Sequence, residues 1–476
     1  MAKGERSRQS RRRGKRSGQH KHRPSTPVPD GIKRWPDAWT IVLREGKATL
    51  PLVGHPWLFS GAIGHALAPT HAPPHAAPVA GDLCGLFDCK GHFLGLGYHN
   101  PKSQISVRIL ATTADGVAPK NMPAVATLVR ERLTKAAAMR AHVGLPASDT
   151  TAWRLCNSEG DDLPGLVIDR MADGAVVLVS TAGARRWVDD VLAMLTKDLD
   201  CRWVVVRTAH NSHPSESLDE GVIATSGEVP EQVEVLHHGL RMVAEPKRGQ
   251  KSGLYTDQFD NHIAVAALAK DRYVIDAYCH GAGFGLHAAH AGARKVVCID
   301  ASQHAAELAE ENIRRNELEH IEVMQGDAVH LLSDIAEDLT TADDGRPDLV
   351  IVDPPKFATR ASVTDDALRK HEHLNSVAIG SLSSGGILVS CVCSGRIDSE
   401  GFLRMLARSA RRAGKDLRLL EMRGAGFDHP SRAAHAEARY LKVAICTVSD
   451  RATQPPGSEN RAKRKVETWS PIDPST

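Results

Sequence analysis

The chain of 476 residues is long enough for about three domains of ~100–200 residues each. It has no run approaching the ~18 apolar residues of a membrane span, and its charged start lacks the apolar segment of a signal peptide. We therefore expect a cytoplasmic protein with no membrane contact. The nine cysteines are an odd number without a C-x-x-C pair, and the 24 histidines show no metal-ligand spacing, so we expect free thiols and no metal site.

Both ends of the chain are predicted to be disordered. In the N-terminal arm, residues 1–36, the stretch from Lys3 to Arg23 is nearly all Arg, Lys, Gly, Ser and Gln, with Glu5 as its one acid. Such an arm binds polyanions by displacing their counterions, so RNA is the expected partner and a solubilising tail is the alternative. The C-terminal tail, residues 449–476, is rich in Pro, Ser and charged residues.

Residues 37–113 are predicted to form a small β-rich domain, either an RNA-reading barrel or a scaffold. Short alternating runs at 40–43, 83–87, 93–98 and 105–110 are separated by turn residues, and the Ala/Pro/His-rich insert 66–80 is expected to be a loop. Residues 114–232 are predicted to form a central α+β domain, with helices at 122–144 and 185–197 and strands at 166–170, 175–180 and 203–207. In it, Asp161, Asp162 and Asp169 are interpreted as turn and capping residues.

Residues 233–448 are predicted to form an α/β domain. A hairpin at 233–243 leads into alternating strands and helices, the pattern of a parallel sheet covered on both faces. The predicted strands are 273–278, 295–299, 321–324, 348–352 and 386–390, with a last pair at 416–421 and 440–446. The predicted helices are 285–291, 304–315, 366–381 and 399–412.

A nucleotide-type cofactor is expected at the ends of the first three of these strands. Glycines in the turn after the first strand let a ligand approach the backbone, and Asp300 ends the second strand, where a carboxylate can bind a ribose diol. No G-x-x-x-x-G-K-[ST] motif exists, so a nucleoside with a sulfonium fits better than ATP or NAD. The alternative is a βαβ unit without a nucleotide, in which Asp300 caps a helix. The candidate cofactor residues are Asp276, Tyr278, Gly281, Gly283, Phe284, Asp300, Asp327 and Asp353.

Two further strands end in reactive groups that should face one crevice. Asp353, stiffened by two prolines, follows one strand, and Cys393 lies just past the next, before Ser-Gly. A thiolate of lowered pKa that adds to C6 of cytosine makes C5 nucleophilic enough to take a methyl group. We expect Cys393 as the nucleophile, Asp353 on the base edge and Lys356 near the sugar or phosphate. Cys391 is the rival nucleophile, and a packed, unreactive Cys393 is the other alternative.

Together these residues resemble the bacterial 23S ribosomal RNA cytosine-5 methyltransferases with an N-terminal PUA domain, the large subunit methyltransferase I group. The resemblance runs from about Thr40 to Cys446. It rests on residues 55–61, 161–170, 252–258, 353–357, 393–395, 428–430 and 440–442. Departures are Phe259 and His262, where the family usually has arginines, and the run 279–284, where the family favours Tyr-Thr-Gly-Gly-Phe.

The resemblance implies a PUA domain, a central α+β domain and a class I, Rossmann-like methyltransferase domain. It implies S-adenosylmethionine (SAM) as cofactor, large-subunit ribosomal RNA as partner and, in many members, a homodimer. It also implies that Asp300 and Asp327 hold the cofactor, that Asp353 holds the base and that Cys393 attacks it.

Three alternatives stay open at this stage. Asp-Pro-Pro loops also serve methylation of the exocyclic amines of purines, where no cysteine is needed. A second alternative is an RNA-binding module that has lost catalysis, although Asp300, Asp353 and Cys393 speak against it. A small-molecule substrate is the third, and the basic arm speaks against that.

Overall fold

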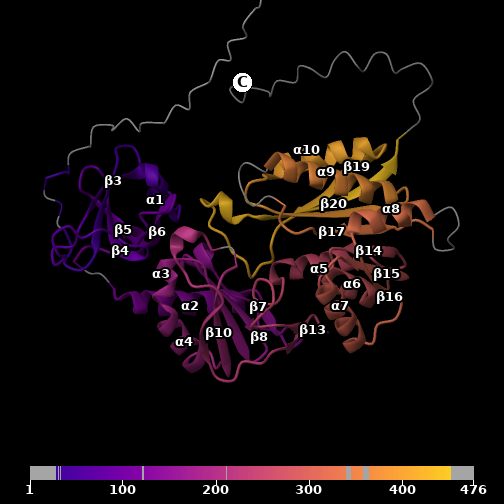
Figure 1. Ribbon diagram of the computed structural model, residues 1–476, viewed down its shortest axis with the longest axis horizontal. Coiled ribbons are helices and arrows are strands. Elements are labelled where there is room, and N and C mark those ends of the chain that lie inside the picture. The colour runs from indigo at the N-terminus through magenta and orange to yellow at the C-terminus, as the bar shows by residue number, and fades with distance from the viewer. Residues whose placement is uncertain are drawn as a thin grey trace, which may run out of the picture.

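The computed structural model describes residues 28–30, 32, 34–120, 123–210, 212–338, 345–357 and 364–451. Most of the predicted basic arm and of the C-terminal tail lies outside these residues. Three sheets follow one another along the chain, from the indigo N-terminal part through the magenta centre to the orange and yellow C-terminal part (Figure 1). None of the described helices is long and apolar enough to cross a membrane.

The first sheet has six strands, as the short alternating runs predicted, although β2 and β3 were not expected. They are β1 (Trp39–Leu43), β2 (Trp57–Phe59), β3 (Ile63–Leu67), β4 (Asp82–Phe87), β5 (Phe93–His99) and β6 (Ile105–Thr112), with the short helix α1 (Thr49–Leu52). Their order is β2-β6-β5-β4-β1-β3. Trp35 packs on Phe87 and Phe93, with ring centroids 6.3 and 5.6 Å away, so this core reaches two residues before the predicted boundary at 37.

The central sheet has the order β11-β10-β9-β8-β7. Its elements are α2 (Val125–His142), β7 (Ala152–Asn157), β8 (Leu166–Met171), β9 (Gly174–Val179), α3 (Ala182–Arg185), α4 (Val188–Lys197), β10 (Trp203–Thr208) and β11 (Val222–Ser226). The interpretation as turn and capping residues is confirmed for Asp161 and Asp162 and wrong for Asp169. Asp161 ends a short 3-10 helix, Ser158–Asp161, whose C-cap is Asp162, and its carboxylate accepts from the Asn157 amide at 2.6 Å as well as pairing with buried Arg140. Asp169 instead lies within β8 and forms a buried ion pair with Arg154, because a buried guanidinium needs a charged partner.

The predicted hairpin is confirmed as β12 (Val233–His237) and β13 (Leu240–Ala244). Both turn residues have positive φ, 46° at His238 and 81° at Gly239, as a two-residue hairpin loop of type I′ requires. The hairpin leads from the central sheet into the third one.

The third sheet is the predicted parallel one, with the order β16-β15-β14-β17-β18-β20-β19 and β20 antiparallel to both of its neighbours. Its strands are β14 (Tyr273–Ala277), β15 (Lys295–Asp300), β16 (Ile321–Gln325), β17 (Leu349–Val352), β18 (Ile387–Cys393), β19 (Lys415–Arg423) and β20 (Leu441–Asp450). Its helices are α5 (Phe259–Ala266), α6 (Gly283–His290), α7 (Gln303–Arg315), α8 (Ala328–Asp338), α9 (Thr364–Ser381) and α10 (Ser399–Arg412). Buried apolar clusters cover both faces, as the continuous apolar strands predicted, whereas α5 and α8 were not expected.

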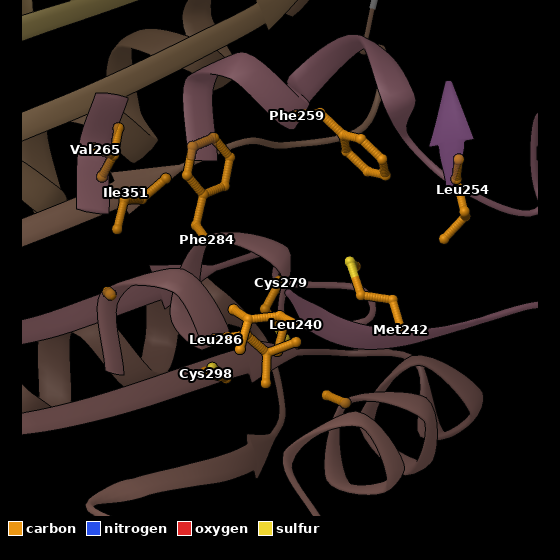
Figure 2. Packing of buried hydrophobic residues seen from close by; sticks show 14 of the residues in the cluster. Leu240, Met242, Leu254, Phe259, Val265, Cys279, Phe284, Leu286, Cys298 and Ile351 are labelled. Carbon is orange, nitrogen blue, oxygen red and sulfur yellow. The ribbon is translucent and has the colours of Figure 1, made fainter. Parts of the chain in front are cut away.

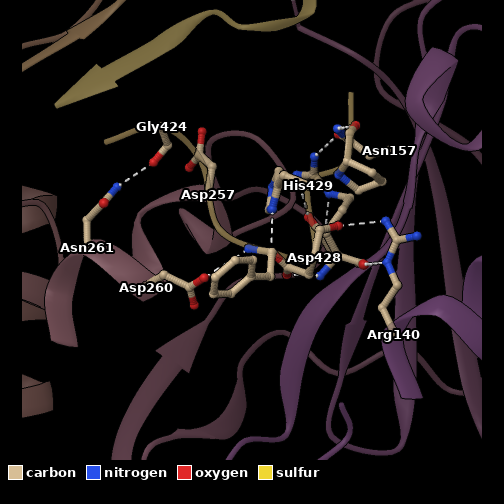
Figure 3. A network of polar contacts seen from close by, with 12 residues as sticks. Arg140, Asn157, Asp257, Asp260, Asn261, Gly424, Asp428 and His429 are labelled. Carbon is tan, nitrogen blue, oxygen red and sulfur yellow. Dashed lines mark hydrogen bonds and ion pairs between the residues drawn. The ribbon is translucent and has the colours of Figure 1, made fainter. Parts of the chain in front are cut away.

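The segment between β19 and β20 returns to the central sheet. The backbone oxygen of Asp428 accepts a hydrogen bond from Arg140 at 2.6 Å, and its carboxylate accepts one from the Arg154 amide at 2.7 Å (Figure 3). Asn157 donates to the Pro430 oxygen at 2.9 Å. These contacts join the central and third parts of the chain beside the carboxyl ends of the strands.

Candidate active site

The carboxyl ends of three parallel strands bring the predicted reactive groups together. Val352, the last residue of β17, pairs with Ala277 at the end of β14 and with Ser390 in β18. Asp353 therefore follows at the same level of the sheet as Cys391, and its amide lies 3.3 Å from the Ala277 oxygen. The two predicted reactive groups therefore lie at the ends of adjacent parallel strands, at one edge of the sheet, as the sequence predicted.

Asp353 is partly buried and held by one strong hydrogen bond. Gln258 Nε2 donates to its Oδ2 at 2.8 Å. Burial raises the pKa of Asp353 to about 6, although the Gln258 hydrogen bond and the Lys251 charge act in the opposite direction. The carboxyl group therefore changes its protonation state near neutral pH. The two prolines after it are followed by Lys356, which is exposed.

The two cysteines of β18 lie on the same side of the strand at different depths. The strand continues through Cys393, rather than ending before it, so alternate residues share a face. Cys391 is fully buried, whereas Cys393 at the open end is partly exposed. The expected lowering of the thiol pKa is wrong. Burial raises the pKa of Cys393, only partly opposed by the Lys251 charge, and raises that of Cys391 much further.

A charged network beside the thiol was not recognised as part of the site. Lys251 Nζ lies 2.6 Å from the Asp257 carboxylate, to which the Tyr440 hydroxyl donates at 2.8 Å. Lys442 Nζ donates to the Ser394 oxygen at 2.7 Å, next to the nucleophile candidate. Except for Lys251, these residues lie in or beside the segments 252–258, 393–395 and 440–442. In the sequence analysis, segments 252–258 and 440–442 supported only the resemblance, and the segment 393–395 contributed only Cys393 as a reactive group.

Asp276, one residue before the end of β14, and Asp300, the last residue of β15, lie near the predicted cofactor turn on adjacent strands. Asp276 Oδ2 accepts a hydrogen bond from the Gly285 amide at 2.9 Å, and burial raises the pKa of this carboxyl to about 7. Its Oδ1 has no hydrogen-bond partner among the described residues. Asp300 accepts from the amides of His280 at 3.0 Å and Ser302 at 2.9 Å. Each Asp300 oxygen keeps a lone pair, which fits a ribose diol.

The turn between β14 and α6 is held in an uncommon backbone conformation. Tyr278, His280 and Ala282 have φ of 65°, 49° and 61°, in the left-handed region that side chains rarely adopt. Asn312, fully buried on α7, donates to the Gly281 oxygen at 3.0 Å and accepts from the Val243 amide at 2.9 Å. Such strain at a ligand loop persists only where surrounding contacts enforce it, so Asn312 is a support that the sequence did not reveal.

The remaining candidate cofactor residues occupy different surroundings. Phe284 is 4% exposed and lies among the buried apolar side chains of the core (Figure 2). Gly283 lies against the ring of His262. Tyr278 is partly exposed, and burial raises the pKa of its hydroxyl to about 12. Asp327 is exposed and accepts a hydrogen bond from the His330 amide at 2.9 Å, in the first turn of α8.

Two family models match this chain, one for a PUA-like domain over residues 41–112 and one for an S-adenosylmethionine-dependent methyltransferase over residues 200–434. With the sheet order and the strand-end carboxylates, they define a SAM-dependent methyltransferase of class I fold that carries a PUA-like domain. More particularly, the chain belongs to the family of the proteins named Ribosomal RNA large subunit methyltransferase I. The member from Shewanella frigidimarina is 32% identical over 412 residues, which cover 86% of this chain and 99% of that protein. The member from Pseudoalteromonas atlantica is 29% identical, with the same coverage.

Solved structures share the fold. A SAM-dependent methyltransferase from Streptococcus mutans superposes with a TM-score of 0.70 at 17% identity. The methyltransferase SMU.776, complexed with SAH, gives 0.71 at 18% identity. Each match covers 86% of this chain and 99% of the other.

Proposed function

We propose that this chain forms 5-methylcytidine in large-subunit ribosomal RNA. The observation that carries the proposal is the placement of a partly exposed thiol, Cys393, and a carboxyl group, Asp353, at the ends of adjacent parallel strands. The name shared by the relatives supports ribosomal RNA as the substrate. The PUA-like domain supports contact with RNA.

In the proposed cytosine-5 methylation, Cys393 and Asp353 have different roles. Cys393 Sγ forms a bond to C6 of a cytosine turned out of its stack, and the electron pair of the C5–C6 double bond moves into the ring. Asp353, held by Gln258, binds the N3 and amine edge. Bound SAM would supply the methyl group that becomes bonded to C5, and S-adenosylhomocysteine would be the leaving group. Loss of the C5 proton then restores the double bond and expels the thiolate.

The residues of the cofactor turn fit SAM by charge and shape. Asp300 is proposed to hold the ribose, and the partnerless Asp276 Oδ1 offers a buried acceptor beside the glycine turn. Gly281 and Gly283 keep the backbone of the turn approachable. The proposed roles of Tyr278, Phe284 and Asp327 have less support, because Phe284 packs in the core and Asp327 is already bonded at the start of a helix.

The protonation state of the thiol sets a condition on this mechanism. Because the pKa of Cys393 is raised by burial, the thiol must lose its proton when the base arrives. Lys251 and the exposed Lys356 lower that pKa, so their charges stabilise the thiolate as it forms.

A trapping experiment tests the proposal. With 5-fluorocytidine at the target position, C5 has no proton to lose, and a covalent protein–RNA adduct should accumulate. We expect an adduct with the wild type and with Cys391→Ala, and none with Cys393→Ala. Peptide mapping that places the adduct on Cys391, or turnover without any adduct, contradicts the covalent mechanism.

A second candidate is methylation of an exocyclic purine amine, and the raised pKa of Cys393 favours it. In that reaction Asp353 binds the amine and Cys393→Ala keeps its activity. Mass spectrometry of ribosomal RNA nucleosides from a deletion strain separates the two. Loss of 5-methylcytidine supports the first candidate, and loss of a methylated purine supports the second. Failure of the wild type to bind SAM in calorimetry would instead indicate an inactive RNA-binding module.

The homodimer and the cytoplasmic location stay predictions. Light scattering of the purified chain tests the first, and fractionation of the source cells tests the second.

A further inference from the structure

Three buried histidines from three separate elements converge beneath the cofactor turn. His237 ends β12, His262 lies on α5 and His287 lies on α6. Their exposed fractions are 1%, 5% and 3%. One ring nitrogen from each lies within 4.8 Å of the other two. Spacing in the sequence could not reveal this group, because its members come from distant segments that meet only in the folded chain.

The hydrogen bonds of His287 assign its proton to one side of the ring. Nδ1 lies 2.8 Å from the Gly283 oxygen, one turn earlier in α6, whereas Nε2 lies 3.3 Å from the His237 oxygen. A neutral imidazole has one N–H, and we assign it to the shorter contact. Nε2, on the side of the ring toward His237, then carries a lone pair. A ring N–H bonded to a backbone carbonyl, with the opposite nitrogen free, is the usual arrangement of a metal-binding histidine.

The other two histidines lack the hydrogen bonds that buried rings normally make. Neither nitrogen of His237 has a partner among the described residues, and neither does Nδ1 of His262. Burying such groups unpaired is unfavourable, so their persistence points to an interaction that the protein chain alone does not supply.

Neighbouring groups fix the rings in place. His237 stacks on Phe259, with centroids 3.8 Å apart and planes at 23°, and the His262 ring lies 4.5 Å from that of Phe284. Both phenylalanines are among the buried side chains of Figure 2. His262 lies over Gly283, where an added Cβ would come within 2.4 Å of its ring. The rings are therefore oriented before any ligand arrives, which lowers the entropy lost on binding.

The protonation states are consistent with ligation. Burial lowers the pKa of His287 to about 4 and lowers the pKa of His237 and of His262 well below the ordinary histidine range. All three rings are neutral at neutral pH, and a neutral imidazole is the form that donates a lone pair to a metal.

We propose that His237, His262 and His287 form a binding site for a divalent transition-metal ion, with zinc(II) as the first choice. Imidazole nitrogen is a preferred zinc ligand, at about 2.0–2.1 Å, so the three nitrogens, which lie within 4.8 Å of one another, move closer together when the ion binds. Three protein ligands leave the fourth tetrahedral position for a water molecule or another small ligand. A metal here joins the β12–β13 hairpin, α5 and α6 one turn after its start, and so supports the cofactor turn that leads into α6. The proposed metal site is independent of the proposed function, because it holds whichever RNA base is methylated.

Metal binding is measured on untagged, full-length protein after treatment with a chelator. Cobalt(II) is the spectroscopic probe, because ligation by nitrogen in a tetrahedral site gives strong visible absorption bands. Zinc(II) is then titrated by calorimetry. We expect about one ion per chain in the wild type.

The matched variants are His287→Gln and His290→Gln, the same substitution at a buried and an exposed position of α6. His290→Gln should bind zinc like the wild type. His287→Gln should bind it more than about 100-fold more weakly, because loss of a mere supporting group already costs about 10–100-fold in affinity. Equal affinity in the two variants, or no cobalt bands in the wild type, overturns the proposal.

Thermal unfolding with and without zinc separates loss of binding from loss of folding. Zinc at one hundred times its Kd should raise the folded-to-unfolded ratio of the wild type about 100-fold and raise its melting temperature. Metal-free His287→Gln should melt cooperatively and show no zinc-dependent shift. If that variant does not fold, His237→Gln, which keeps the hydrogen bond between His287 and the Gly283 oxygen within α6, replaces it. If zinc raises the melting temperature of either folded variant as much as that of the wild type, the three histidines do not form the zinc site.

Discussion

Replacing Gln258 with leucine tests how the protein controls the protonation of Asp353. Gln258 Nε2 donates to the Asp353 carboxylate at 2.8 Å, and the amide itself is 3% exposed. The N–H group stabilises the ionised carboxylate more than the neutral acid. Its loss must therefore raise the pKa of Asp353 above its present value of about 6.

The size of the change follows from the strength of one hydrogen bond to a charged group. Such a bond contributes about 1.5–3 kcal/mol, and 1.36 kcal/mol corresponds to one pH unit. The pKa should then lie between about 7 and 8. Because Asp353 is partly exposed, water can replace some of the lost interaction, so we expect a value near the lower end.

The assay is the pH dependence of kcat/KM for methyl transfer from labelled SAM to a ribosomal RNA transcript, from pH 5 to 9. In the pH profile of the wild type we expect a limb near pH 6 from the titration of Asp353. This limb should move to about pH 7 or above in Gln258→Leu. Gln232→Leu, a substitution at an exposed position outside the site, should leave it in place. A limb of Gln258→Leu that stays near pH 6 or moves to lower pH refutes the electrostatic role of the amide.

Three further predictions concern groups around the site. Lys251→Met should raise the pKa of Cys393 further and slow its alkylation by iodoacetamide, followed by peptide mass spectrometry; an unchanged rate would contradict the charge effect. Arg140→Leu removes the ion-pair partner of the buried Asp161 carboxylate and should lower the free energy of unfolding by about 3–5 kcal/mol. The control Arg130→Leu removes an exposed ion pair and should lower it by only about 0.2–1 kcal/mol. Urea unfolding midpoints that shift equally in the two variants would refute this prediction. Asn312→Leu removes the hydrogen bond to the Gly281 oxygen in the cofactor turn and should weaken SAM binding about tenfold, as measured by calorimetry. Wild-type affinity in this variant would show that the turn keeps its conformation without Asn312.

The parallel sheet could be predicted from the sequence because its inner strands β14, β15, β17 and β18 are short, mostly apolar runs. The carboxyl ends of parallel strands meet at one edge of the sheet. Asp353 and Cys393 could therefore be predicted to lie near each other from their positions at two strand ends alone. The strand β7 could not be predicted in the same way. It carries Arg154 into the core, where only the Asp169 ion pair from a separate strand makes that burial tolerable.

Residues that tune the reactive groups could not be found from local patterns. Gln258 and Lys251 come from a segment about 100 residues before Asp353, and no periodicity links them to it. The raised pKa of Cys393 also depends on residues that are distant in the sequence. Exposure and neighbouring charge depend on how β20 and the 251–258 segment cover the strand end, which is a property of the assembled fold rather than of the motif.

The central part of the chain is connected to Asp353 through the segment that returns from β19. The Arg154 amide binds the carboxylate of Asp428, and the neighbouring Phe427 amide donates to Asp260 on α5 at 2.9 Å (Figure 3). On the same helix, Asn261 donates at 2.7 Å to the oxygen of the Gln258 amide. This bond fixes which end of the amide is the oxygen, so the nitrogen points toward Asp353, whose ionised carboxylate can only accept. The orientation of one glutamine thus depends on contacts that begin in another sheet. Substitutions at Asp260 should therefore alter the pH profile of catalysis without touching the substrate.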